Sequence, residues 1–228
     1  MKKSNLGTVL LFLSMLILAN AQDWANLNRY SAENAMLKPP SKDAQRVVFM
    51  GNSITESWFK FHPEYFEDHR YQGRGISGQT TPQMLLRFRA DVIDLKPTVV
   101  VILAGTNDIA GNTGPMSLEM IRDNIISMVE LAQVNGIKVI LASVLPAAEY
   151  PWKKGMDPVH KIPALNTLLK EYAAQTGITY LDYYRAMVDQ QLGLKVGLTY
   201  DGVHPNRAGY DLMETLVEQA LLKILTSH

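Results

Sequence analysis

Residues 98–108 read TVVVILAGTND, and this stretch decides the fold. Its first part, TVVVILAG (98–105), is a continuous run of aliphatic, mostly β-branched side chains that lies between Pro97 and a polar turn. A short apolar run without alternation is typical of a strand that is buried on both faces, as in a parallel sheet. We therefore predict a buried strand here, with the polar residues that follow it lying at the edge of the sheet.

Similar short apolar segments occur before and after this strand, and amphipathic segments alternate with them. Gly136 and Gly177 follow two of the amphipathic segments, as expected at helix ends. The predicted strands are RVVFM (46–50), a weaker one at 71–75, TVVVILAG (98–105), IKVILASVL (137–145) and ITYLDY (178–183). The predicted helices cover 81–95, 117–136, 162–177 and 207–225. This alternation predicts an α/β domain with a parallel sheet between helices, whose chemistry lies where strands end.

The N-terminus has the pattern of a secretory signal peptide. Lys2 and Lys3 precede the apolar run VLLFLSMLIL and the small-residue site ANAQ, so we expect cleavage between Ala21 and Gln22. An uncleaved membrane anchor or a buried N-terminal helix remains an alternative, although the run is short for a spanning helix. The expected organisation is a signal peptide (1–21), a polar lead-in (22–45) and one α/β domain (46–228).

The amino-acid composition indicates where the protein is expected to be located and which partners it is not expected to bind. Acidic and basic residues balance at 22 each, and the chain contains no cysteine. With no basic cluster beyond the signal, the sequence predicts neither nucleic acid nor an anionic membrane as a partner. Without a cysteine for lipid attachment, a secreted or periplasmic protein with no stable membrane anchor is expected.

The stretch GRGISG (73–78) matches the G-x-G-x-x-G pattern of dinucleotide-binding loops. That function would require an acidic residue about 20 positions further on, at the end of the next strand. The next strand instead ends in Gly105, Thr106 and Asn107. The acidic residue that follows them, Asp108, lies further from the glycines than this spacing. The sequence therefore disfavours a dinucleotide site.

Polar residues follow several of the predicted strands. Ser53, in GNSITESW (51–58), stands at the start of a predicted helix, where unpaired N–H groups favour an anion; it could also simply cap that helix. Asn107 could donate hydrogen bonds to an oxyanion or belong to a turn. Asp201 and His204 could form a carboxylate–imidazole pair or a helix-start turn, and they are too few for a metal site.

Taken together, the blocks GNSIT, GISGQTT, GTND and DGVHPN resemble the SGNH hydrolase family, also called GDSL esterases and lipases. The resemblance spans roughly residues 46–210. It implies a flavodoxin-like three-layer α/β/α sandwich, with a parallel sheet of about five strands, and ester hydrolysis without a cofactor or metal. Asn52 and Ser57 depart from the family pattern, where Asp and often Gly stand.

The resemblance also implies a role for each site residue. Ser53 corresponds to the nucleophile, His204 to the base and Asp201 to the residue that orients it. The Ser53 N–H, the Gly78 N–H and the Asn107 side chain correspond to the oxyanion hole.

The substrate is expected to be a small-molecule or glycan ester, most simply an acetyl ester of a carbohydrate. Trp58, Tyr150 and Trp152 could stack on sugar rings if they are exposed near the site, or they could pack in the core. Lipases, arylesterases and acylhydrolases of lipid-like esters remain alternatives within the family, and a non-catalytic glycan-binding module is a more distant one. Three other histidines are expected to be surface or structural residues: His62, His69 and His160.

Overall fold

The computed structural model describes residues 23–41 and 45–226, and its centre is one parallel sheet. The predicted signal peptide therefore lies outside the described residues. The five strands follow the order β2-β1-β3-β4-β5 and every adjacent pair is parallel. They are β1 (Val47–Gly51), β2 (Gln72–Gly75), β3 (Val99–Ile102), β4 (Lys138–Ala142) and β5 (Thr179–Leu181). The predicted strands are thus all present, although most are shorter than expected.

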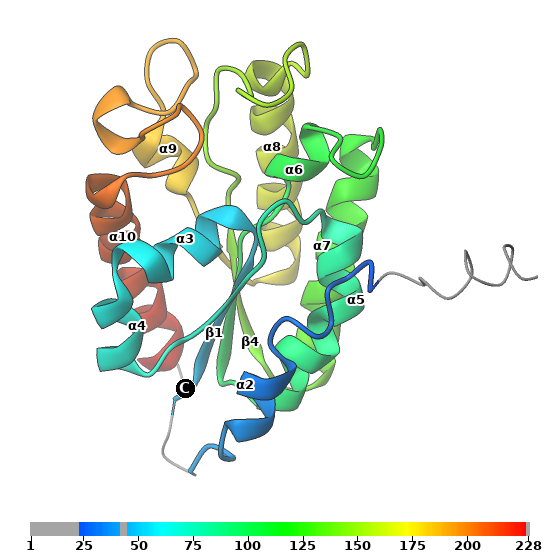
Figure 1. The fold of residues 1–228 in the computed structure, drawn as a ribbon, viewed down its shortest axis with the longest axis vertical. Helices are drawn as coiled ribbons and strands as arrows, with labels where there is room; N and C mark the ends of the chain where they lie inside the picture. Colours follow the sequence, from blue (N-terminus) through cyan, green and yellow to red (C-terminus); the bar gives the residue numbers. More distant parts are fainter. Residues whose placement is uncertain (1–22, 42–44, 227–228) are drawn as a thin grey trace, which may run out of the picture.

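Helices cover both faces of the sheet (Figure 1). One face carries α5 (Thr81–Asp91), α7 (Leu118–Val134) and α8 (Pro158–Thr176). The other carries α3 (Ser53–Phe61), α4 (Pro63–His69), α9 (Tyr183–Met187) and α10 (Arg207–Thr226). The short elements are α2 (Ser31–Met36), α6 (Thr106–Ile109) and the 3-10 turns η1 (Ile93–Leu95) and η2 (Val196–Leu198). The predicted three-layer α/β/α architecture is confirmed.

Successive strand residues point to opposite faces and so build two separate cores. Val48 and Val100 pack with α5, α7 and α8, whereas their neighbours Phe49 and Val101 pack with α3, α4 and α10. All four are almost fully buried. Because both faces of the sheet are covered, β3 needs an uninterrupted apolar sequence, which is the pattern found at 98–105.

Two helix boundaries differ from the prediction. The helix predicted over 81–95 ends at Asp91, because Val92 leaves the helical conformation (φ −130°) and a 3-10 turn follows. The helix predicted from residue 162 begins at Pro158 and contains Pro163 within its second turn. A proline costs little at the first helical position, so Pro158 suits the start of α8.

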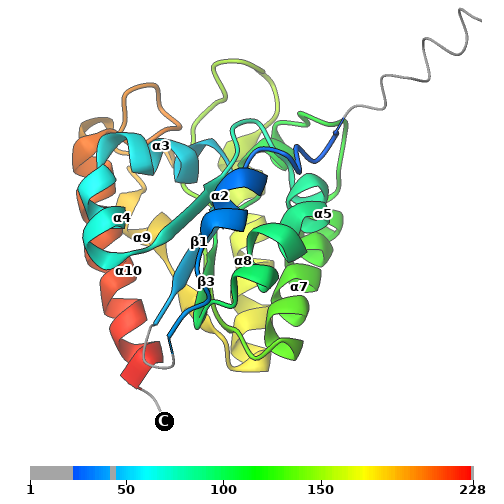
Figure 2. The same ribbon diagram turned by 60° about the horizontal axis from the view of Figure 1, so that its bottom comes forward.

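Residues 23–41 of the lead-in, which was predicted as a polar segment, pack against the domain. They contain α2, which lies beside α5 (Figure 2). Asn34 donates to the carbonyl of Ala90 at 3.1 Å, and the Tyr30 hydroxyl donates to the carbonyl of Gly75. Among the described residues, no helix has both the length and the apolar character that a membrane-spanning segment requires.

Candidate active site

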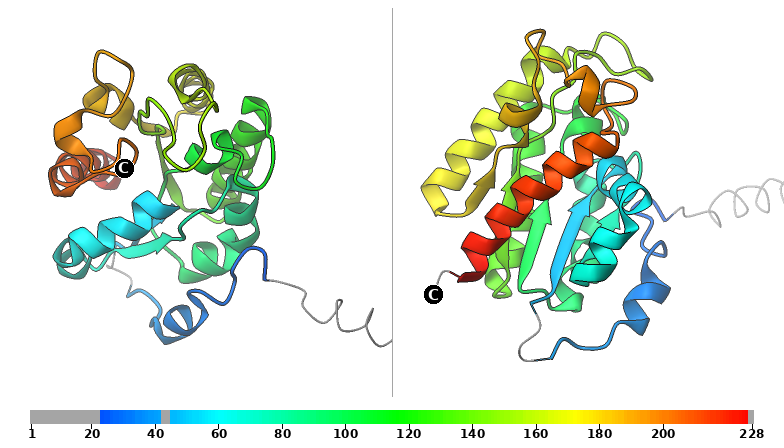
Figure 3. Two further views of the ribbon diagram at one scale, coloured as in Figure 1. Left: turned by 45° about the horizontal axis from the view of Figure 1, so that its top comes forward. Right: turned by 90° about the vertical axis from the view of Figure 1, so that its left-hand side faces the viewer.

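Loops that follow the strands meet at one edge of the sheet, the edge turned toward the viewer in the left panel of Figure 3. Side chains from these loops surround an open cavity of about 330 Å³. The lining residues are Ser53, Ser77, Gly78, Asn107, Asn112, Trp152 and His204. Five of the residues singled out in the sequence are therefore neighbours, although they come from separate parts of the chain.

Ser53 is the first residue of α3, directly beyond the turn that ends β1. This turn requires Gly51, because a Cβ there would lie 1.9 Å from Thr55 Oγ1. Asn52, not Ser53, occupies the N-cap position, so the alternative that Ser53 merely caps the helix is wrong. Ser53 Oγ instead lies 2.9 Å from His204 Nε2, within hydrogen-bond distance.

Asp201 holds the other side of the His204 ring. Its Oδ2 lies 2.7 Å from Nδ1, while its Oδ1 accepts from the backbone N–H groups of His204 (2.7 Å) and Val203 (2.9 Å). Partial burial alone would raise the pKa of Asp201, but these hydrogen bonds outweigh it and lower the pKa below its usual range. The carboxylate is therefore ionised at neutral pH and available to stabilise a proton on His204.

Gly78 and Asn107 line the same cavity as Ser53 and His204. Gly78 has φ +77°, a conformation that glycine adopts without strain, and a Cβ there would meet open space. Asn107 is buried and donates one amide hydrogen to the carbonyl of Gln79 at 2.9 Å. An amide nitrogen carries two hydrogens, so a second donor remains on the side chain that lines the cavity.

Two of the three aromatic residues proposed to contact substrate are in the core. Trp58 is 1% exposed, donates to Glu214 Oε1 at 2.9 Å and stacks with Tyr210, so the expectation of an exposed ring at this position is wrong. Tyr150 is 0% exposed, and the same correction applies to it. Trp58 lies within α3 and donates to Glu214 of α10, and Tyr150 lies on the segment between β4 and α8. The burial of both depends on packing between elements that are distant in sequence, which the sequence alone could not reveal.

Trp152 is the aromatic residue that does reach the cavity. Its ring is 44% exposed and stacks on the buried Tyr150 with a centroid distance of 5.1 Å. Tyr150 thus serves as a support for Trp152. The indole N–H donates to Asn112 Oδ1 at 3.3 Å, and Asn112 in turn donates to the carbonyl of Gly78 at 3.2 Å.

Tyr200 was missed in the sequence and is a second aromatic residue beside His204. It is 57% exposed and stacks on the imidazole at 5.7 Å with a 12° interplanar angle. Trp152 lies 5.9 Å from the same imidazole. The available signal was the position of Tyr200 directly before Asp201, since a residue adjacent to a site motif is placed at the rim of the site.

The three glycines of GRGISG have different surroundings. Gly73 and Gly75 belong to β2, and a Cβ on Gly75 would lie 2.2 Å from the backbone nitrogen of Glu56 in α3. The close approach of β2 and α3 therefore explains Gly75, whereas a Cβ on Gly73 would make an ordinary contact with Phe66 and Gly78 lines the cavity.

One group of side chains among the described residues could share a metal ion: His62, Asp211 and Glu214. The His62 Nδ1 lies 3.0 Å from Glu214 Oε1, an oxygen that already accepts from Trp58. His62 is buried and structural, as expected. His69 contacts the carbonyl of Tyr65, and the exposed His160 pairs with Asp157.

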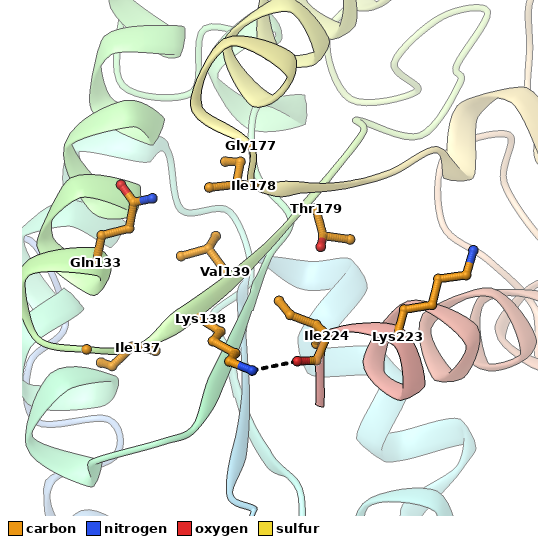
Figure 4. Close-up of a pocket in the computed structure, with 10 residues that line it drawn as sticks. Gln133, Ile137, Lys138, Val139, Gly177, Ile178, Thr179, Lys223 and Ile224 are labelled. Carbon is orange, nitrogen blue, oxygen red and sulfur yellow. Dashed lines mark hydrogen bonds between the residues drawn. The ribbon is translucent and has the colours of Figure 1, made fainter. Parts of the chain in front are cut away.

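A larger cavity of about 450 Å³ lies at the opposite edge of the sheet, near the starts of β4 and β5 (Figure 4). Lys138 crosses it and donates to the carbonyl of Ile224 at 2.7 Å. Its lining residues include none of the candidate site residues that the sequence predicted. Size alone therefore does not locate the chemistry, and the smaller cavity around Ser53 is the candidate site.

Known proteins resemble the chain in both sequence and structure. The sequence profile of the GDSL-like lipase/acylhydrolase family matches residues 49–212. The crystal structure of a GDSL-like lipase from Bacteroides thetaiotaomicron is 52% identical, with a TM-score of 0.87, and the match covers 88% of this chain and 99% of that one.

Two curated proteins are similar over part of their length. The acetylxylan esterase of Xylanibacter ruminicola is 26% identical over 218 residues, which cover 80% of this chain and 44% of that protein. The uncharacterized lipoprotein YqeF of Bacillus subtilis is 41% identical over 78 residues, 33% of this chain and 32% of that protein. The chain thus spans less than half the length of these two relatives. The family match, by contrast, covers most of the described domain and all four sequence blocks around the cavity, and the chain belongs to the GDSL-like lipase/acylhydrolase family.

Proposed function

We propose that the protein is a carboxylic ester hydrolase in which Ser53 is the nucleophile. The single observation that carries this proposal is the chain of contacts from Ser53 Oγ to His204 Nε2 (2.9 Å) and from His204 Nδ1 to Asp201 Oδ2 (2.7 Å). A serine is a weak nucleophile unless a neighbouring base accepts its proton. The arrangement provides that base, together with a carboxylate that orients it.

The reaction proceeds through an acyl-enzyme. Ser53 Oγ attacks the ester carbonyl carbon while its proton passes to His204 Nε2, and the resulting imidazolium is stabilised by Asp201. His204 then gives the proton to the departing alkoxide, which leaves as the alcohol. Water, deprotonated by His204, attacks the acyl-enzyme and releases the acid, and the proton returns to Ser53.

Three donors face the oxygen that becomes negatively charged. They are the N–H of Ser53, at the start of α3, the N–H of Gly78 and the free amide hydrogen of Asn107. Such fixed donors act where charge develops and need no reorganisation during the reaction. The N-terminus of α3 adds a favourable partial positive charge.

The proposed substrate class is small acyl esters, most simply acetyl esters on carbohydrate. The cavity at Ser53 is open and small, which suits a short acyl group carried by a larger alcohol. The exposed rings of Trp152 and Tyr200 both lie next to His204, where the alcohol leaves, and aromatic rings can pack against the apolar faces of sugars. The similarity to an acetylxylan esterase supports this choice.

A lipid-like or aryl ester is the second candidate, because a solved structure that is 52% identical to this chain is that of a GDSL-like lipase. Export to the periplasm or the medium is also part of the proposal. It is supported by the N-terminal sequence pattern and by the similarity to a protein named as a lipoprotein.

The proposal is tested with purified wild type and Ser53→Ala on p-nitrophenyl acetate, acetylated xylan and long-chain p-nitrophenyl esters. We expect hydrolysis of p-nitrophenyl acetate and acetate release from xylan by the wild type, and a loss of both by on the order of 10³-fold or more in Ser53→Ala. Full activity in the variant would overturn the assignment of Ser53. Faster hydrolysis of long-chain esters than of acetyl esters would favour the lipase alternative, and no hydrolysis would favour a binding module.

A further inference from the structure

Arg87, on α5, is fully buried below the active site and makes three hydrogen bonds. Its Nε donates to the side-chain oxygen of Gln79 (2.6 Å), Nη1 to Asp91 Oδ2 (2.9 Å) and Nη2 to the carbonyl of Gly51 (2.9 Å). A guanidinium offers its donors in a rigid, planar arrangement, so these three partners are held at fixed relative positions.

The contact with Gly51 reaches the loop of the nucleophile. Gly51 ends β1 and lies two residues before Ser53. Its carbonyl also accepts from the N–H of Ile76 at 3.3 Å, at the start of the loop that contains Gly78. Arg87 therefore fixes the turn that sets the direction of the Ser53 N–H.

The hydrogen bond from Arg87 to Gln79 connects Arg87 with the other two oxyanion donors, the Gly78 N–H and the Asn107 side chain. Gln79 directly follows Gly78, and its backbone carbonyl accepts from Asn107 Nδ2 at 2.9 Å. Its side-chain amide is 96% buried and donates to the carbonyl of Ala25 at 2.7 Å. The Gln79 side chain is thus held from both ends, by Arg87 and by the N-terminal segment.

We propose that Arg87 and Gln79 are positioning residues that fix the relative geometry of the three oxyanion donors. This inference rests on the proposed function. A buried ion pair is a poor way to gain stability, since apolar side chains of similar volume often replace one without loss. The hydrogen bonds that Arg87 donates to Gly51 and Gln79 therefore explain the buried Arg87–Asp91 pair better than a gain in stability does.

The first test is Gln79→Met, which keeps the side-chain volume and removes both side-chain hydrogen bonds. We expect kcat for p-nitrophenyl acetate to fall by about 10- to 100-fold, because small displacements of a site have effects of this size. KM should change less than about 2-fold, because the donors act on the transition state. The affinity for phenylboronic acid, which forms a tetrahedral adduct with an active serine, should fall in parallel with kcat. The pH dependence of kcat should stay unchanged, since His204 and Asp201 are untouched.

A second variant tests the same role in case Gln79→Met does not fold. Arg87→Met combined with Asp91→Leu removes the ion pair without leaving a buried charge unpaired. It should keep a wild-type Tm within a few degrees while kcat falls as in Gln79→Met. The matched control is Arg74→Met, which removes another buried arginine whose side chain bonds to Asn34 and Gly73 rather than to the site loops. Its kcat should stay near that of the wild type.

The outcomes separate the two proposals. If the folded Gln79→Met and the double variant keep kcat within 2-fold, the positioning role is wrong. An equal loss of kcat in Arg74→Met also overturns it, because the effect would then be general destabilisation. A wild type that does not hydrolyse any ester contradicts the proposed function instead.

Discussion

The loop of residues 199–206 holds Asp201 and His204 by contacts within itself, whereas Gly78 and Asn107 depend on groups that are distant in sequence. In the loop, Thr199 Oγ1 donates to the carbonyl of His204 at 2.7 Å, and Asp201 accepts from two nearby backbone N–H groups. In contrast, Asn107, which lines the same cavity, donates to the carbonyl of Gln79, 28 positions away. The proton-transfer half is local and partly exposed, whereas the oxyanion half is assembled from several elements and combines the buried Asn107 with the exposed Gly78.

Two aspartates show the same contrast electrostatically. In the proton-transfer half, hydrogen bonds outweigh partial burial and lower the pKa of Asp201. In the oxyanion half, burial dominates and raises the pKa of Asp108 to about 6, although Thr81 donates to its Oδ1 from both backbone and hydroxyl. The other oxygen of Asp108, Oδ2, is buried with no hydrogen-bond partner. The comparison teaches that a partly hydrated loop can support a charge, which a dry interior supports only with difficulty.

The largest effect is expected from removing the base. His204→Ala should lower kcat on p-nitrophenyl acetate by at least about 10³-fold, because Ser53 then lacks a proton acceptor. Steady-state kinetics measure it, with the exposed His160→Ala as the control that keeps wild-type activity. A loss below about 10-fold would show that another group accepts the proton.

Removing one oxyanion donor should have the next largest effect. Asn107→Ala should lower kcat by about 10²- to 10³-fold, with little change in the pH dependence, because His204 and Asp201 still act together. The exposed Asn135→Ala is a matched control. If Asn107→Ala shifts the pH profile as strongly as it lowers kcat, the two halves are not separate in function.

The variant Asp108→Asn tests whether the buried carboxyl of Asp108 makes the stability of the protein depend on pH. A carboxyl whose pKa is higher in the folded than in the unfolded protein binds more protons when folded. The free energy of unfolding therefore falls as pH rises from about 4 to about 6, and the ionised group costs up to about 3 kcal/mol above that window. Asp108→Asn lacks this term, so its Tm relative to the wild type should be higher at pH 8 than at pH 4.5.

Differential scanning calorimetry across this pH range measures the effect, and the exposed Asp123→Asn is its control. A difference in Tm between Asp108→Asn and the wild type that does not vary with pH would show that Asp108 titrates in its usual range.

The smallest effect is expected at the rim. Trp152→Ala should raise KM for acetylated xylo-oligosaccharides by about 3- to 10-fold, since one aromatic contact contributes about 1 kcal/mol. The kcat should stay within about 2-fold. Trp24→Ala, which removes another exposed indole, is the control. An equal rise in KM for p-nitrophenyl acetate would argue against a sugar contact at Trp152.

The sequence predicted what is encoded locally. The strands follow from apolar runs such as residues 98–105, and Asp201 and His204 follow from a spacing of three within one loop. Contacts between elements that are distant in sequence produce no such pattern in the sequence. Trp58 faces α10 instead of the cavity, Tyr200 reaches His204 by stacking, and Arg87 looks like one of many helix-surface arginines until α5 is docked on the sheet.

The most direct test of the account is covalent labelling of the intact wild type with a fluorophosphonate, followed by mass spectrometry. An activated Ser53 predicts one adduct per chain, located in the peptide that contains Ser53, absent in Ser53→Ala and formed much more slowly in His204→Ala. An adduct on a different residue, or full labelling of Ser53→Ala, would contradict the assignment of Ser53 as the nucleophile.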